Sequence, residues 1–217
     1  MTGRDKNPKR YPDLYFEQTI RQRLGLEFIV GIDEAGRGAW AGPVVAAAVI
    51  LPLSDPHCLQ LFPGVNDSKQ LTPAKREQSY EIIVAHALAW AISAVPAPEI
   101  DQLGIVSANF KAMKQALRGL DPAGEYLLID GRFPLPNLNL PQKAIIKGDT
   151  LSLSIAAASI LAKVTRDRYM VQISEQYPDY QFAKHKGYGT LAHYNAIRKN
   201  GTCSLHRQSF LPTQASQ

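Results

Sequence analysis

The chain has 217 residues, a length that predicts one domain with room for a small appendage. Its 45% hydrophobic and 20% charged residues match an ordinary globular protein and exclude wholesale disorder. The net charge of +5 lies entirely in residues 184–217, which hold five Lys and Arg and no Asp or Glu. The two cysteines are far apart and match no zinc spacing, and no apolar segment resembles a secretory leader or a membrane span. We therefore expect a cytoplasmic protein without a disulfide scaffold or a structural zinc site.

The N-terminal part of the chain predicts a basic extension followed by a hairpin. Residues 1–26 are polar and basic, and within them residues 15–24 have the apolar spacing of a short amphipathic helix. The first strand is expected at residues 28–33. A glycine-rich turn at residues 36–38 separates it from a second apolar run at residues 44–51, so the two runs predict antiparallel strands.

The middle of the chain predicts helices that alternate with strands. Thr72 is a candidate N-cap followed by Pro73 at the first helical position, which predicts a helix over residues 74–86. A third strand is expected at residues 87–95, ended by a proline-rich segment, and a helix at residues 105–120.

Two further strands and a long helix follow. Residues 126–130 and 143–147 are short apolar runs typical of strands, and residues 151–177 give the longest helical signal. This order of elements favours an α/β fold, with a mixed sheet of about five strands flanked by helices.

We expect residues 27–189 to form the main domain and residues 190–217 a helical C-terminal extension. Two short helices are predicted after Gly189, and the tail from residue 211 is predicted to be disordered. A basic, acid-free segment on a neutral body suggests a polyanionic partner such as nucleic acid, because each phosphate contact releases counterions. A merely solvated basic surface would look the same in the sequence.

Four carboxylates stand at the ends of predicted strands. Asp33 and Glu34 end the first strand, Asp130 ends the fourth, and Asp149 follows the fifth at the start of the long helix. Catalytic groups in open α/β sheets gather at such strand ends. Acids brought together there repel one another unless a cation joins them, and hard oxygen ligands suit Mg²⁺ or Mn²⁺.

Two of these acids also have simpler explanations. Asp130 could be ordinary turn chemistry, and Asp149 could simply cap the long helix. Asp33 and Glu34 are harder to explain structurally. Because successive strand residues face opposite sides, both reach one site only if the strand ends there.

The loop Gly36-Arg37-Gly38 follows the paired acids. Glycines let backbone N–H groups approach a phosphate closely, and an arginine adds a bidentate donor. A single such triplet is usually only a turn, but beside paired acids it suggests a substrate cradle next to a metal.

Several blocks of the sequence, in order, resemble one family. They are Gly31-Ile32-Asp33-Glu34-Ala35-Gly36-Arg37-Gly38, Asn66-Asp67-Ser68-Lys69, Ile129-Asp130-Gly131, Lys147-Gly148-Asp149, the helix Ser154–Asp167, His185-Lys186-Gly187-Tyr188-Gly189, and His206-Arg207. These blocks resemble type 2 ribonuclease H, the bacterial ribonuclease HII, over about residues 28–210. One departure is Ala39-Trp40, where the family more usually has a proline and a smaller aliphatic residue.

The resemblance implies an RNase H-like fold and a metal-dependent endonuclease. Such an enzyme cleaves the RNA strand of RNA–DNA hybrids and nicks duplex DNA at single embedded ribonucleotides, leaving 5′-phosphate and 3′-hydroxyl ends. It implies that Asp33, Glu34, Asp130 and Asp149 bind metal and act in catalysis, with two Mg²⁺ or Mn²⁺ ions when substrate is present. It also implies that Gly36, Arg37, Gly38 and Tyr188 recognise the ribonucleotide, although Tyr188 alone would suggest only an exposed aromatic in a glycine turn.

The remaining candidates are phosphate contacts, and they are Ser68, Lys69, Lys163, Lys184 and Lys186. Lysines of this kind are often only solvated, and Lys163 could instead balance the acids. We expect a monomer that binds no membrane. The alternatives to the hybrid endonuclease are a non-catalytic nucleic-acid binder and a nuclease of the same fold that acts on DNA junctions.

Overall fold

The computed structural model describes residues 11–212, and its centre is a five-stranded sheet with the order β3-β2-β1-β4-β5. The strands are β1 (Ile29–Ala35), β2 (Val44–Ile50), β3 (Ala89–Val95), β4 (Tyr126–Asp130) and β5 (Gln142–Ile145). β1, β2 and β3 pair antiparallel, whereas β4 is parallel to both β1 and β5. The predicted hairpin and mixed sheet are confirmed.

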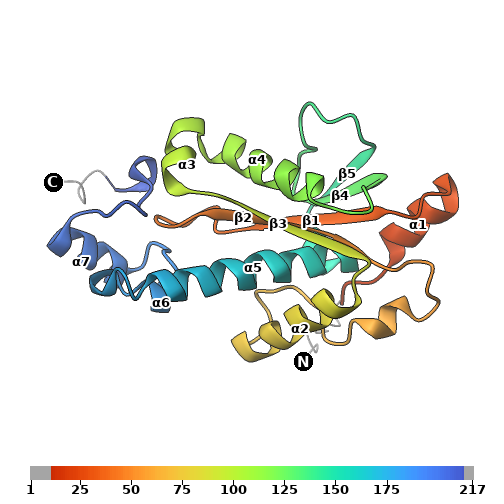
Figure 1. Ribbon diagram of the computed structural model, residues 1–217, viewed down its shortest axis with the longest axis horizontal. Coiled ribbons are helices and arrows are strands. Elements are labelled where there is room, and N and C mark those ends of the chain that lie inside the picture. Colours follow the sequence, from red (N-terminus) through yellow and green to blue (C-terminus); the bar gives the residue numbers. More distant parts are fainter. Residues whose placement is uncertain (1–10, 213–217) are drawn as a thin grey trace, which may run out of the picture.

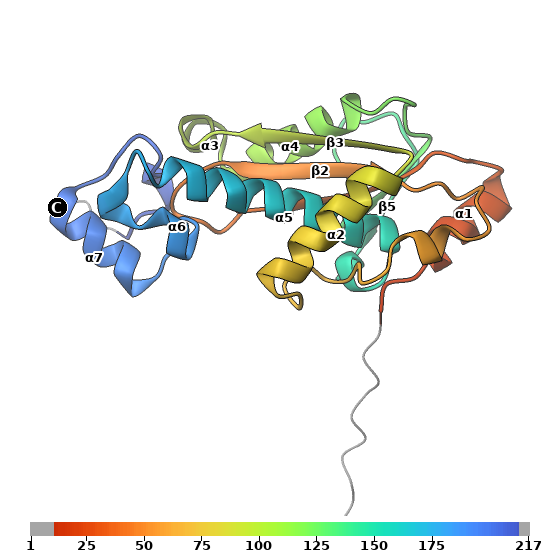
Figure 2. The ribbon, with the colours of Figure 1, turned by 60° about the horizontal axis from the view of Figure 1, so that its bottom comes forward.

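Helices cover both faces of this sheet (Figure 1). α3 (Ala97–Leu103) and α4 (Ile105–Arg118) lie on one face, while α5 (Leu153–Ile173) and α2 (Pro73–His86) lie on the other. α6 (Phe182–His185) and α7 (Leu191–Asn200) gather at the C-terminal end of α5 (Figure 2), and α1 (Tyr15–Leu24) lies at the opposite end. Within residues 11–212, no helix is long and apolar enough to cross a membrane.

The alternation of side chains along β1 determines which helix each residue meets. Val30 and Ile32 belong to the core beneath α4, whereas Gly31 faces α5. A Cβ atom on Gly31 would lie 2.1 Å from the carbonyl carbon of Ser154, so only glycine allows α5 to pack this close. The close packing places the start of α5 directly over the middle of the sheet.

The start of α5 is also tied to the N-terminal helix. Glu17 of α1 is fully buried and accepts hydrogen bonds from Ser152 Oγ at 2.6 Å and from Ser154 Oγ at 2.6 Å. Burial raises the pKa of Glu17, while these hydrogen bonds lower it. Part of the predicted N-terminal extension therefore packs on the element that follows Asp149.

Some predicted elements differ from the structure. The proline-rich segment after β3 begins a helix, α3, that was not predicted. Pro96 is its N-cap residue and Pro98 lies in its first turn, where the missing N–H of proline is harmless. The two short helices predicted after Gly189 are α7 and a three-residue 3₁₀ helix at Gln208–Phe210. α6 precedes Gly189. The predicted disorder from residue 211 falls largely outside the described residues.

Candidate active site

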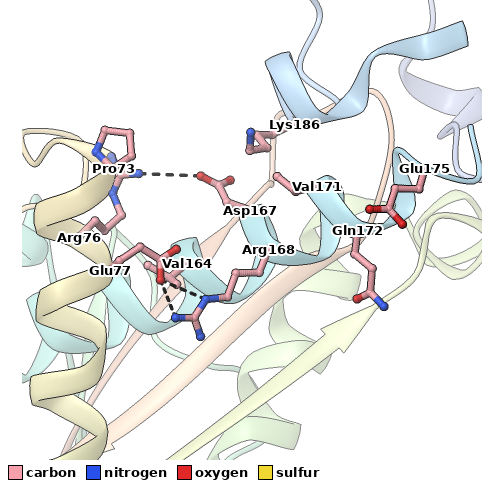
Figure 3. Close-up of a pocket in the computed structure, with 10 residues that line it drawn as sticks. All are labelled: Pro73, Arg76, Glu77, Val164, Asp167, Arg168, Val171, Gln172, Glu175 and Lys186. Carbon is pink, nitrogen blue, oxygen red and sulfur yellow. Dashed lines mark hydrogen bonds and ion pairs between the residues drawn. The ribbon is translucent and has the colours of Figure 1, made fainter. Parts of the chain in front are cut away.

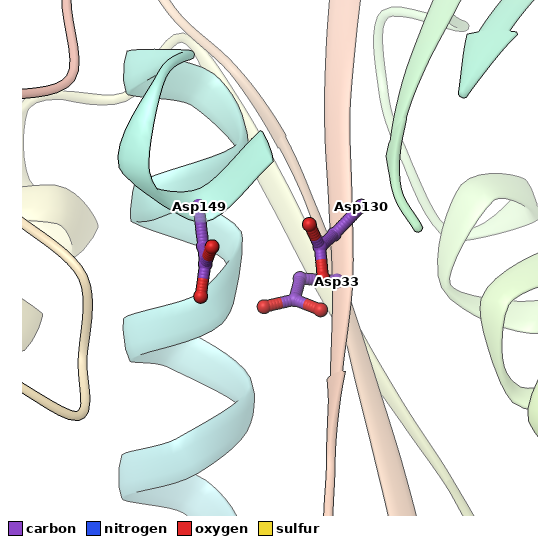
Figure 4. A group of neighbouring side chains, drawn as sticks. All are labelled: Asp33, Asp130 and Asp149. Atoms are coloured by element: carbon purple, nitrogen blue, oxygen red, sulfur yellow. The ribbon is translucent and has the colours of Figure 1, made fainter. Parts of the chain in front are cut away.

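Three of the predicted acids meet at one edge of the sheet (Figure 4). One carboxylate oxygen from each of Asp33, Asp130 and Asp149 lies within 4.8 Å of the others. Asp33 is on β1, and Asp130 is the last residue of the neighbouring parallel strand β4. Asp149 is in a short 3₁₀ turn, Gly148–Thr150, between β5 and α5. The parallel arrangement of β1, β4 and β5 therefore brings together acids that are far apart in sequence.

Hydrogen bonds hold these carboxylates in place. Asp130 Oδ1 accepts from the backbone N–H of Gly148 at 2.7 Å, and Asp33 Oδ1 accepts from Glu34 N–H at 2.7 Å. Lys69 Nζ donates to Asp149 Oδ2 at 3.1 Å.

The cap of α5 is Ser152, whose Oγ accepts from the N–H of Ile155 at 3.3 Å. Helix capping therefore does not explain Asp149.

Glu34 lies beside this group on the other side of β1. The prediction that the strand ends at Asp33 is wrong, because β1 continues to Ala35 and pairs Glu34 with Ala46 of β2. The two acids consequently face opposite sides of the sheet, with Asp33 hydrogen-bonded to Ser159 of α5 and Glu34 to Asn109 of α4. Glu34 therefore lies outside the three-carboxylate group, although it lines the same cavity.

The electrostatics of the three carboxylates favour a cation. Asp33 and Asp149 are each only 4% exposed. Burial, followed by the charges of Glu34 and Asp130, raises the pKa of Asp33 well above its ordinary value. Burial and the charge of Asp149 likewise raise the pKa of Asp130. A divalent cation with hard oxygen ligands would relieve this repulsion, so the donor set fits Mg²⁺ or Mn²⁺.

A cavity of about 390 Å³ opens beside the acids. It brings together most of the residues predicted from the sequence, namely Asp33, Glu34, Gly36, Arg37, Gly38, Ser68, Lys69, Asp130, Lys163 and Tyr188. Asp149, Lys184 and Lys186 are not among the described residues that line it, although Asp149 lies next to Asp33 and Asp130. Lys184 is exposed and donates to Gln181, and Lys186 lines a different cavity.

That second cavity, of about 550 Å³, lies between α2 and α5 (Figure 3). Its charged side chains pair with one another, since Arg168 binds Glu77 and Arg76 lies 3.8 Å from Asp167. Asp167 also accepts from Lys163 at 2.8 Å, so Lys163 pairs with this carboxylate at the boundary between the two cavities. We assign no catalytic role to the second cavity.

Comparison with known proteins identifies the family. A family model described as Ribonuclease HII matches residues 30–213. The chain belongs to the ribonuclease HII family. It is 52% identical to ribonuclease HII of Chloroflexus aurantiacus over 93% of this chain and 94% of that protein. It is 50% identical to ribonuclease HII of Acidothermus cellulolyticus over 93% of this chain, and the match spans 64% of that longer protein.

The fold agrees with solved ribonuclease HII structures. The RNase HII chain in the PCNA:RNase HII complex from Archaeoglobus fulgidus is 26% identical, with a TM-score of 0.69 over 86% of this chain and 96% of that chain. The RNase H-like fold predicted from the sequence is confirmed, and membership of ribonuclease HII makes the chain an endoribonuclease.

Ser159 and Arg166 lie in the helix block Ser154–Asp167 that resembles the family, but no role was predicted for either residue. Ser159 Oγ lies 3.0 Å from Ser68 Oγ and also hydrogen-bonds Asp33, which lowers the pKa of that acid. The signal was available, because Ser159, Lys163 and Arg166 are spaced four and three residues apart and so share one face of α5. In this ribonuclease HII chain that face borders the acids at one end and the Gly36-Arg37-Gly38 loop at the other.

Arg166 joins the two segments predicted to recognise the ribonucleotide. Its guanidinium is fully buried and donates to the carbonyls of Pro43 at 2.8 Å, Ala41 at 3.0 Å and Lys186 at 2.9 Å. Gly36, with φ of +85°, leaves room for it, since a Cβ atom there would lie 1.9 Å from Arg166 Nε. The loop after β1 and the segment before Tyr188 are thus attached to a single side chain.

Proposed function

We propose that the protein is a metal-dependent endonuclease of RNA–DNA duplexes. It cleaves the RNA strand of hybrids and nicks duplex DNA at single embedded ribonucleotides, leaving 5′-phosphate and 3′-hydroxyl ends. The observation that carries the proposal is a group of three converging carboxylates, two of which, Asp33 and Asp130, line the same cavity as the glycine loop and Tyr188.

Asp33, Asp130 and Asp149 would hold the metal, with Glu34 close by on the α4 side. When bound, two Mg²⁺ or Mn²⁺ ions supply an activated water and stabilise the leaving 3′-oxygen. Because Asp33 and Asp130 lie on adjacent strands and Asp149 is in a hydrogen-bonded turn, their oxygens are positioned before any ligand arrives.

The other residues that line the cavity would hold the substrate. Lys69 and Lys163 provide positive charge for the phosphates, and the backbone at Gly36 and Gly38 can approach a phosphate closely. The Tyr188 ring lies 5.4 Å from Lys163 Nζ and 5.2 Å from the Arg166 guanidinium carbon. We assign to Tyr188 the contact that distinguishes a ribose from a deoxyribose, since the 2′-hydroxyl is what separates RNA from DNA at one nucleotide.

A non-catalytic nucleic-acid binder is less consistent with these residues. Carboxylates repel phosphates, so a binding surface gains nothing from three of them grouped at its cavity. A DNA-junction nuclease would use the same acids, and it differs only in the substrate it cleaves.

The decisive experiment uses two duplexes of identical sequence, one all-DNA and one with a single embedded ribonucleotide. We expect a nick at the ribonucleotide with Mg²⁺ or Mn²⁺ and none with a chelator, while the all-DNA duplex stays intact in both conditions. Cleavage of an all-DNA junction but not of the ribonucleotide duplex would overturn the proposal.

Replacement of Tyr188 by alanine tests the recognition step. We expect Tyr188→Ala to lower kcat/KM at a single ribonucleotide by about 10- to 100-fold, because it removes a shaped contact to one sugar. Binding to the all-DNA duplex should barely change, since non-specific affinity comes mostly from lysine and arginine. Tyr15→Ala, at an exposed tyrosine of α1, is the matched control. Equal losses on both substrates would mean that Tyr188 only supports the local fold.

A further inference from the structure

The turn that carries Tyr188, residues 187–190, is held by backbone hydrogen bonds on both sides. Tyr188 N–H donates to the carbonyl of His185 at 2.9 Å, and Thr190 N–H donates to that of Tyr188 at 2.8 Å. From the loop after β1, the N–H groups of Trp40 and Ala41 both donate to the carbonyl of Gly187, at 2.8 and 3.2 Å. The path of the chain through this turn is therefore tied to residue 40.

The indole of Trp40 also fills the space beside Gly189. A Cβ atom on Gly189 would lie 2.3 Å from Trp40 Cε2 and 2.4 Å from Cζ2. Gly189 is not in the left-handed region, so its own backbone conformation would accept alanine. Contact with the indole is thus the reason that this position has no room for a side chain.

The indole has little room to retreat. The backbone of Trp40 is fixed at both ends, because its carbonyl accepts from Arg207 N–H at 2.8 Å and its N–H is bound to Gly187. On the side of α7, the indole centroid lies 5.6 Å from the ring of His193, which is fully buried.

His193 is held by its own hydrogen bonds. Its Nδ1 lies 3.0 Å from the carbonyl of Tyr188 and must donate to it, so its Nε2 accepts from Nε2 of His206 at 3.1 Å. His193 thus links the surroundings of the indole directly to the backbone of Tyr188.

We propose that Trp40 is a positioning residue for Tyr188. The indole packs between His193 and Gly189, fixes the position of the turn, and so orients the Tyr188 ring toward the cavity. The inference rests on the proposed role of Tyr188 in recognising the ribonucleotide. It assigns a function to part of Ala39-Trp40, a segment at which the sequence departs from the family pattern.

The test adds side-chain volume at Gly189 and removes it at Trp40, first separately and then together. Gly189→Ala pushes the turn away from the indole, and we expect it to lower kcat/KM at a single ribonucleotide by at least about tenfold, with all-DNA binding unchanged. Trp40→Leu removes part of the support and should cause a smaller loss. In the double variant, leucine leaves space for the new methyl group, so most of the activity lost by Gly189→Ala should return.

Two further variants separate this inference from the proposed function. If both substitutions act through Tyr188, neither should reduce activity further in a Tyr188→Ala background. An undiminished effect there, or no recovery in the double variant while Tyr188→Ala itself is impaired, would overturn the positioning role. If Tyr188→Ala cleaves normally, the recognition role of Tyr188 fails instead. Thermal denaturation shows whether Gly189→Ala folds, and if it does not, Trp40→Leu in the two backgrounds still decides the matter.

Discussion

The active site has charges of opposite sign on two sides, and the protein stabilises them differently. The acid wall is Asp33, Asp130 and Asp149, and the arginine wall is the fully buried pair Arg166 and Arg207, which lies behind the loop after β1. On the sheet side, burial and mutual repulsion raise the pKa of Asp33 and of Asp130. On the side of the recognition loops, burial lowers the pKa of Arg166, and it lowers that of Arg207 to about 9. On both sides, therefore, burial disfavours the charged form of the side chain.

The difference lies in what each charge contacts. Arg166 meets three backbone carbonyls, and Arg207 donates to the carbonyls of Gly42 and Arg37, both at 3.0 Å. The carboxylates instead meet one another, and Lys69, which provides the cation contact to Asp149, has a side chain that is 75% exposed. Backbone carbonyls thus compensate most of the arginine charge within the protein, although Arg207 Nη2 has no partner among the described residues, whereas the acids would be compensated by the cation that we propose.

The largest expected effect comes from removing one acid. Asp130→Asn should lower cleavage by about 1,000-fold, because it removes a metal ligand, while hybrid affinity should hold or rise as repulsion of the phosphates decreases. Single-turnover cleavage and equilibrium binding measure the two quantities. Asp179→Asn, at an exposed acid, is the control. Near wild-type cleavage would remove Asp130 from the catalytic set.

Substitution of a buried arginine should lower the free energy of unfolding. Arg166→Lys leaves buried carbonyls without donors, so we expect it to lower the free energy of unfolding by about 3 kcal/mol. Arg168, two residues along α5, pairs with Glu77 and Glu81 on the surface, and Arg168→Lys should change it by less than about 1 kcal/mol. Urea denaturation compares the two. Equal effects would mean that the buried carbonyl contacts add nothing.

A bound divalent metal should stabilise the folded protein through the acids and independently of the buried arginines. At 100 times its Kd, Mg²⁺ should add about 2.7 kcal/mol, which corresponds to a Tm increase of roughly 5–10 °C for a chain of this size. The increase should persist in Arg166→Lys and shrink in Asp130→Asn. Differential scanning calorimetry with and without Mg²⁺ provides the measurement, and an equal increase in Asp130→Asn would contradict a site that depends on this acid.

Acid should weaken the recognition side through its histidines. Burial lowers the pKa of His193 from 6.5 to about 4, and it also lowers the pKa values of His185 and His206. Below pH 6.5 the unfolded state therefore binds more protons than the folded state. The contribution of His193 to the free energy of unfolding is fully present above pH 6.5 and is lost as the pH falls toward 4. Between pH 7 and pH 5 we expect a loss of about 2 kcal/mol from His193.

The comparison with His193→Asn isolates this contribution. The amide nitrogen of asparagine can replace Nδ1 as donor to the carbonyl of Tyr188 but does not titrate. Acids with raised pKa values act in the opposite direction and cancel between the two proteins. Chemical denaturation at each pH gives the difference, and parallel stability curves would show that His193 does not contribute.

Local signals in the sequence predicted most of the fold. Thr72 followed by Pro73 marked the start of α2, where Thr72 Oγ1 accepts from Lys75 N–H at 3.3 Å. The apolar runs marked all five strands, since such runs depend on the neighbouring residues alone. The helix α3 was missed because a proline-rich segment can end a strand or begin a helix, and packing on α4 decides between them.

By itself the sequence predicted the residues to which we assign the chemistry, because strand ends and glycine turns place acids and loops where side chains converge. Only the tertiary structure decided which of these residues lie on the same face of the sheet. The continuation of β1 through Ala35 turned Asp33 toward α5 and Glu34 toward α4, since side chains alternate along a paired strand. The contact between Trp40 and Gly189 joins segments nearly 150 residues apart, and no local pattern encodes it. Such contacts arise from packing, which depends on the whole chain at once.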